Sequence, residues 1–160
     1  MQESRIFYNS RDNETSFSVY GKRNFAAGAT NENISMITYT GNNVIYIKDI
    51  VFSSNAVAKV ELYFDATYVS GGAEVIPLNL NRGSALTSET TCYSGDTTLV
   101  ATSTSANEVF DVRLNKSTFQ MDFHGAIMLT KNTSLILLGE VENPGEKIRT
   151  MVYFYEADKS

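Results

Sequence analysis

The sequence predicts an all-β protein, an antiparallel β-sandwich of jelly-roll-like architecture with an extended N-terminal arm. Three observations lead to this prediction. Apolar and polar side chains alternate in several segments, as they do along strands that have one face on a core. Residues that favour turns, mainly Gly, Asn, Ser and Thr, separate these segments at intervals of about ten residues. No segment combines the apolar period of a helix with helix start and stop signals.

The alternation is clearest in three segments, each with an apolar face and a polar face. In chain order these apolar faces are Val60, Leu62 and Phe64; Phe110, Val112 and Leu114; and Phe119, Met121 and Phe123. Two longer apolar runs, residues 43–52 and 133–141, predict strands that are covered on both faces or lie at a subunit contact. A final strand is expected over residues 147–156. An immunoglobulin-like sandwich remains the alternative, although that fold more often carries a Trp and a pair of Cys residues.

Composition excludes several classes of partner. The 160 residues include 42% hydrophobic residues, which is enough for the core of one domain. Thirteen basic and eighteen acidic residues give a net charge of −5, so we expect no nucleic-acid partner. No apolar run has the length of a membrane helix, and we expect no membrane partner. The single Cys and the absence of a secretory signal pattern predict synthesis and assembly in a reducing cytoplasm.

Residues with the chemistry of an active site are few. His124 is the only histidine, which removes most arrangements that need an imidazole with oriented partners. Asp122 shares its strand face, but two ligands do not make a metal site. Cys92 has no basic neighbour in sequence that would favour a thiolate. Acidic residues are scattered along the strands. We therefore expect no catalytic residue, no cofactor and no metal, and we do not expect an enzyme.

Two segments depart from the regular strand pattern. Residues 1–32 are expected to form an N-terminal arm or edge strands, and residues 33–160 the sandwich domain. Large apolar side chains in the arm must be buried, either on their own domain or on a neighbouring subunit. Residues 83–107 are rich in Ser and Thr and predict a long loop with one weak strand. The candidate interface residues are Ile6, Phe7, Tyr8, Phe17, Tyr20, Phe25 and Arg82.

Two motifs carry a family resemblance. The first is GGAEVIPLNLNRGS at residues 71–84, and the second is GAIMLTKNTSLILLGEVEN at residues 125–143, followed by a closing strand that ends in Phe154, Tyr155 and Glu156. Over residues 43–156 the chain resembles a group of small virion proteins of tailed bacteriophages. The motifs consist of turns and strands, and the group has no catalytic residues to carry over.

The resemblance implies a location in the virion after assembly in the host cytoplasm. It implies a capsid decoration or cement protein that binds the major capsid protein or other virion proteins and forms a homo-oligomer, with a trimer favoured. The alternative is a tail or fibre component that binds a carbohydrate receptor. A cellular β-sandwich unrelated to virions is a third hypothesis. Arg82, in the first motif, has the planar donor group that suits contacts between subunits.

Overall fold

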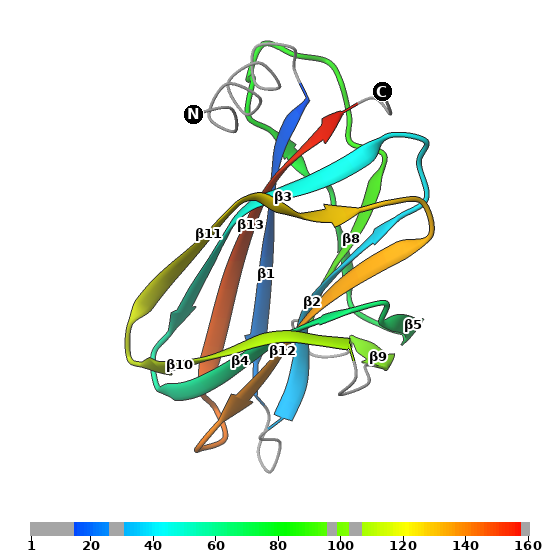
Figure 1. Ribbon diagram of the computed structural model, residues 1–160. Coiled ribbons are helices and arrows are strands. Elements are labelled where there is room, and N and C mark those ends of the chain that lie inside the picture. Colours follow the sequence, from blue (N-terminus) through cyan, green and yellow to red (C-terminus); the bar gives the residue numbers. More distant parts are fainter. Residues whose placement is uncertain (1–14, 26–30, 96–98, 103–106, 158–160) are drawn as a thin grey trace.

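The computed structural model describes residues 15–25, 31–95, 99–102 and 107–157 (Figure 1). These residues form strands and no α-helix, which confirms the predicted all-β class. None of them forms a helix that is long and apolar enough to span a membrane. In chain order the strands are β1 (Ser16–Asn24), β2 (Asn31–Tyr39), β3 (Val44–Ser54), β4 (Val57–Phe64), β5 (Thr67–Ser70), β6 (Ala73–Val75), β7 (Leu78–Asn79), β8 (Thr90–Ser94), β9 (Val100–Thr102), β10 (Glu108–Asn115), β11 (Thr118–Leu129), β12 (Thr133–Val141) and β13 (Lys147–Ala157).

Two antiparallel sheets pack face to face as a sandwich (Figure 1). Sheet A has five strands in the order β11-β3-β13-β1-β7, and sheet B has six in the order β10-β4-β12-β2-β8-β6. The strands β5 and β9 form a separate two-stranded ribbon. The antiparallel sandwich predicted from the period-two pattern is therefore present.

The long strands pair in a nested order. β1 pairs with β13, β2 with β12, β3 with β11, and β4 with β10. The chain thus runs as two arms of one long hairpin, and each arm alternates between sheet A and sheet B. Nested pairing of this kind is the pattern of jelly-roll folds. Residues 67–95 and 99–102 leave this hairpin between β4 and β10, and we call these described residues the insertion.

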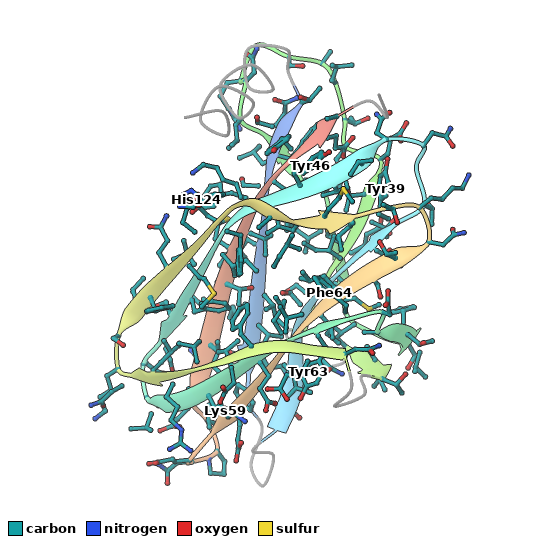
Figure 2. The ribbon with its side chains drawn as sticks, in the orientation of Figure 1. Tyr39, Tyr46, Lys59, Tyr63, Phe64 and His124 are labelled. Atoms are coloured by element: carbon teal, nitrogen blue, oxygen red, sulfur yellow. The ribbon has the colours of Figure 1, made fainter. Side chains whose placement is uncertain are left out.

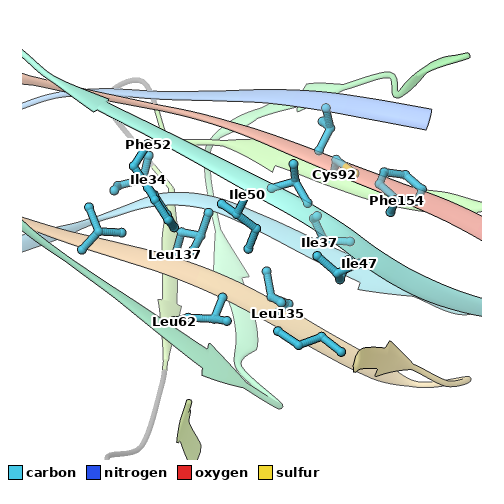
Figure 3. Packing of buried hydrophobic residues seen from close by; sticks show 14 of the residues in the cluster. Ile34, Ile37, Ile47, Ile50, Phe52, Leu62, Cys92, Leu135, Leu137 and Phe154 are labelled. Atoms are coloured by element: carbon cyan, nitrogen blue, oxygen red, sulfur yellow. The ribbon is translucent and has the colours of Figure 1, made fainter. Parts of the chain in front are cut away.

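The core lies between the two sheets (Figure 3). Ile47, Ile50 and Phe52 face inward from β3, and Leu62 faces them from β4, as the sequence predicts. Phe123 is only partly buried, because β11 is the outermost strand of sheet A and lies at the border of the core.

The expected arm is partly a strand of the sandwich. β1 lies inside sheet A, bonded to β13 along its whole length and to β7 at its start. Phe17 and Phe25 are buried in the core, so residues 16–25 of the expected arm pack as part of the sandwich. The physical reason is burial: Phe17 and Val19 alternate with Ser18 and pack against the other sheet.

The expected loop over residues 83–107 also contains a strand of the sandwich. β8 pairs with β2 on one side and β6 on the other. Its inward side chains are Thr90, Cys92 and Ser94, which are buried although two of them are polar. Because small polar residues replace aliphatic ones on the inner face, the sequence shows no apolar alternation there.

Candidate interaction surface on the insertion

Part of the insertion lies over the outer face of sheet B. Its β5–β9 ribbon covers a second apolar cluster outside the main core, which gives β12 buried side chains on both faces, as the sequence predicts. The buried members of this cluster are Met36, Tyr63, Ala66, Leu99 and Ile136, with Tyr93, Ala101 and Leu138 partly buried beside them. A ribbon of two short strands gains its stability from this contact, since an isolated hairpin is marginal in water.

Aromatic and amide contacts fix the ribbon in place. The rings of Tyr68 and Tyr93 stack with their centroids 4.3 Å apart. Burial raises the pKa of Tyr93, and the neighbouring Tyr68 and Glu74 act in the same direction. The Asn33 side-chain amide donates to two carbonyl oxygens of the ribbon, those of Leu99 at 3.4 Å and Ala101 at 3.2 Å.

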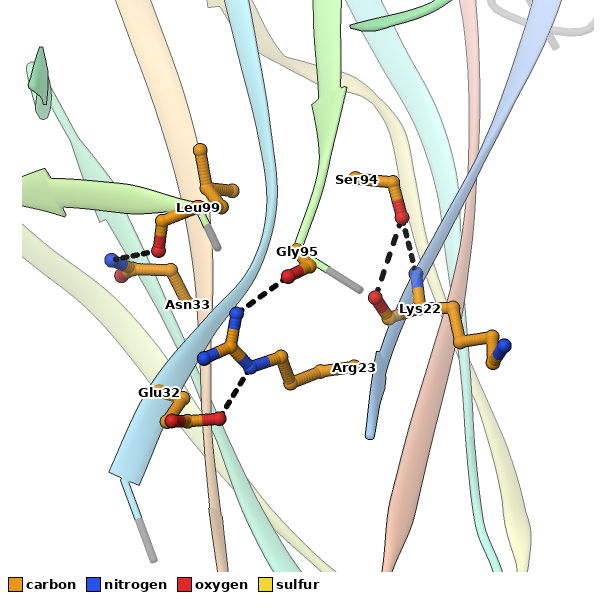
Figure 4. Close-up of polar contacts among 7 residues, drawn as sticks. All are labelled: Lys22, Arg23, Glu32, Asn33, Ser94, Gly95 and Leu99. Atoms are coloured by element: carbon orange, nitrogen blue, oxygen red, sulfur yellow. Dashed lines mark hydrogen bonds and ion pairs between the residues drawn. The ribbon is translucent and has the colours of Figure 1, made fainter. Parts of the chain in front are cut away.

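A buried ion pair joins β1 to β2, and hydrogen bonds beside it reach the insertion (Figure 4). Arg23 donates through Nε to the Glu32 carboxylate and through a terminal nitrogen to the Gly95 carbonyl oxygen. The hydroxyl of Ser94 accepts from the Lys22 amide at 3.0 Å and donates to the Lys22 carbonyl at 3.3 Å. We call this group the Arg23 cluster.

A buried carboxylate holds the start of β8. Glu156, near the end of β13, accepts hydrogen bonds from the Ser88 hydroxyl, from the Glu89 amide at 3.1 Å and from the Thr90 hydroxyl at 3.2 Å. Burial nevertheless raises the pKa of Glu156, because the desolvation of the charge outweighs these donors. Burial and the Glu89 charge also raise the pKa of Tyr39 to about 12.

Turns and side-chain bonds order the rest of the insertion. Gly71 and Gly72 both have positive φ, 74° and 76°, and form the predicted turn between β5 and β6. In the loop after β7, the Asn79 side chain donates to the Leu86 carbonyl at 3.1 Å and accepts from the Asn81 amide at 2.8 Å. These bonds hold the insertion in a defined conformation, and we also call it the platform.

More than half of the exposed large hydrophobic side chains among the described residues lie on this platform. Ile76 is the most exposed of them, at 79%. The six are Tyr68, Val69, Ile76, Leu78, Leu86 and Val100. Three of them, Tyr68, Val69 and Val100, lie on the β5–β9 ribbon, and the other three lie on or beside β7. Exposed apolar side chains grouped on one segment are candidates for contact with another protein.

The structure describes four of the seven residues predicted as an interface. Ile6, Phe7 and Tyr8 lie outside the described residues. Phe17 and Phe25 are buried in the core. Tyr20 is 40% exposed on the outer face of sheet A, and Arg82 is exposed in the loop after β7, on the insertion.

Sequence reasoning missed the exposed apolar residues of the insertion. Ile76 and Leu78 flank Pro77 in a segment punctuated by Gly and Asn. The sequence signal for this exposure is the presence of apolar residues in a turn-rich segment. A segment of turns has no strand face on which such side chains could be buried.

The described residues contain no group of three or more potential metal ligands. His124 is exposed at the bend of β11, and its Nδ1 lies 3.1 Å from an Asp122 oxygen. Figure 2 shows that His124 lies far from Lys59, which is on β4. Cys92 is buried in the core, and burial raises the pKa of its thiol. A shallow depression of about 140 Å³ beside Lys59 is lined by residues of both charges, including Arg113, Glu140 and Glu142.

The fold defines the class, an antiparallel all-β sandwich, and comparisons with known proteins go no further. No protein-family profile and no curated protein sequence matches the chain. A Bacillus thuringiensis Cry1Da tryptic core variant is similar at 10% identity and a TM-score of 0.19, over 91% of this chain and 18% of that one. The infectious bursal disease virus Gx strain structure is similar at 14% identity and a TM-score of 0.18, over 90% and 34%. The chain spans about a fifth and a third of those two chains. Scores this low carry no argument about function.

Proposed function

We propose that this chain is a structural protein of a bacteriophage particle, a capsid decoration or cement protein that binds the major capsid shell. The observation that carries the proposal is the apolar surface of the insertion, with Ile76 and Leu86 exposed on an ordered backbone. The motif resemblance supplies the virion setting, and the insertion supplies the contact surface.

The arrangement of contacts suits this role. The Arg23 cluster and the Glu156 hydrogen bonds fasten the insertion at both ends of β8. Binding through a surface ordered in advance avoids the entropy cost of ordering a loop on the partner. A protein that coats a shell gains by this, because its affinity depends on a small number of well-placed apolar anchors.

Binding to empty shells assembled from the major capsid protein tests the proposal. Ile76→Asp with Leu86→Asp should weaken binding at least about tenfold, because each side chain is replaced by a charge that a dry contact excludes. Met128→Asp is the matched control, an exposed apolar residue on β11, outside the insertion. Circular dichroism should be unchanged in both variants. Equal binding by the double variant and the control would overturn the proposed surface.

One observation favours the alternative, a tail or fibre component that binds a carbohydrate. Tyr68 is exposed, and its hydroxyl is fixed by a 2.8 Å hydrogen bond to the Gly71 carbonyl. One ring face rests on Tyr93, which leaves the other for a sugar. Quantitative mass spectrometry of purified particles separates the two functions: a decoration protein approaches the copy number of the capsid subunit, and a tail component falls far below it.

A further inference from the structure

The two edges of the sandwich differ in whether further strands extend them. At one edge the insertion extends both sheets, because β7 is added to β1 and β8 and β6 are added to β2. At the other edge sheet A ends in β11 and sheet B ends in β10, and no strand among the described residues is added to either. An outermost strand presents unpaired N–H and C=O groups that can bond to another strand.

The first part of β11 is a regular edge. From Thr118 to Asp122 it pairs with β3 without interruption. The register then shifts before Ile127, at a bulge where His124 and Gly125 have φ of 51° and 76°. A bulge of this kind disrupts further pairing, so only residues 118–122 offer a straight strand edge.

The apolar side chains of this edge are incompletely covered. Phe119 is 39% exposed although it faces the core side of sheet A, opposite Phe52. Met121 and Phe123 are partly buried against the core. A strand added to β11 would place its own inward side chains beside these residues and shield them from water.

We propose that the edge of β11 binds the same edge of a second copy, and that this pairing forms a two-fold homodimer. The sequence of the edge is self-complementary in antiparallel pairing centred on Gln120. Phe119 then lies opposite Met121 of the second copy, and Thr118 lies opposite Asp122, so apolar residues meet apolar ones and no carboxylate faces another. The two copies of sheet A become one continuous sheet. This dimer leaves the insertion free and does not depend on what the insertion binds.

The proposed dimer differs from the trimer that the family resemblance favours. A pairing in which each edge binds an identical edge closes after two copies, so three copies cannot be joined by this contact alone. The bulge supports the same conclusion, because it fixes which residues can pair and therefore limits slippage.

Sedimentation velocity over a wide range of concentration tests the dimer in the full chain. The wild type should have twice the monomer mass, and Phe119→Lys should be monomeric, since a charge would face Met121. Tyr20→Lys is the control: its side chain is 40% exposed on the same sheet but lies on β1, and the variant should remain dimeric.

Engineered cysteines test the register. In the proposed dimer two copies of Gln120→Cys lie directly opposite, about 4.5 to 5.5 Å apart at Cβ, and should form an intermolecular disulfide on mild oxidation. Two copies of Thr118→Cys lie four residues apart along the ladder, about 13 Å, and should not. The native Cys92 is buried and should give no background. A wild type that is monomeric at every concentration, a trimer, or equal cross-linking by both variants would overturn the proposal.

Discussion

Loss of the Arg23 charge should weaken the attachment of the insertion to the sandwich. Arg23→Met keeps the length of the side chain but leaves the Glu32 carboxylate and the Gly95 carbonyl without their donor. Removing one member of a buried ion pair costs about 3 to 5 kcal/mol. Glu32 keeps 19% of its side-chain surface in water, so the low end of this range, about 3 kcal/mol, is expected.

Urea unfolding measures this loss. A cost of about 3 kcal/mol lowers the midpoint by about 1 to 3 M, given the usual slopes for small proteins. Arg149→Met is the control, because Arg149 is exposed on the outer face of β13, and a change within about 0.5 kcal/mol is expected. The double variant Arg23→Met with Glu32→Met should recover at least about 1 kcal/mol, since no unpaired charge remains.

Hydrogen exchange locates the effect. Amides of β8 and β9 should exchange faster in Arg23→Met than in the wild type, while those of β3 and β11 should be affected less, because these two strands do not pair with β1, β2 or β8. Equal unfolding midpoints for Arg23→Met and Arg149→Met would show that the ion pair does not hold the insertion, and the account of a fixed platform would fail.

Three further predictions follow from burial. Leu62→Ala should cost about 2 to 5 kcal/mol in chemical denaturation through lost burial and a residual cavity, and an unchanged midpoint would contradict its core position. Gly95→Ala should cost about 1 to 3 kcal/mol or more of stability in thermal melts, because a Cβ there would lie 2.2 Å from the Asn33 carbonyl oxygen. Gly83→Ala is the control: its Cβ would meet only a side-chain oxygen at 3.6 Å, and the variant should be neutral in the same melts. The raised pKa of Glu156 means that the folded chain holds this proton more readily than the unfolded chain, so its contribution to stability is present in acid and is lost as the pH rises through the folded-state pKa. Glu156→Gln cannot ionise, and its melting temperature relative to the wild type should therefore increase between about pH 4 and 7; a constant difference would contradict this sign.

The strands with an aliphatic inner face could be predicted from the sequence, and those without one could not. Val60 and Leu62 alternate with Lys59 and Glu61, and β4 forms where this pattern predicts. β8 has no such pattern, because Cys92 is the only apolar side chain on its inner face. Its burial depends on β2 and β6 closing around it, which is a property of the whole fold.

The candidate surface depends on the same kind of long-range information. Phe17 and Ile76 are both apolar residues in polar segments, and local sequence does not distinguish them. Phe17 is buried because β1 pairs with β13 at the far end of the chain, whereas Ile76 stays exposed because no described segment covers it. The edge of the sandwich that the insertion joins decides whether such residues are buried or exposed. No short sequence motif encodes the choice of edge.

The nested order of pairing has a consequence for how the chain acquires its fold. The long partner of β1 is β13, so sheet A cannot close until residues 147–157 have left the ribosome. Until then Phe17 and Val19 have no permanent neighbours. Contacts so distant in sequence are slow to form. Until they form, the unpaired β1 is prone to aggregation. Synthesis rate, temperature and chaperone supply should therefore govern the yield of soluble protein more strongly than the equilibrium stability of the finished sandwich does.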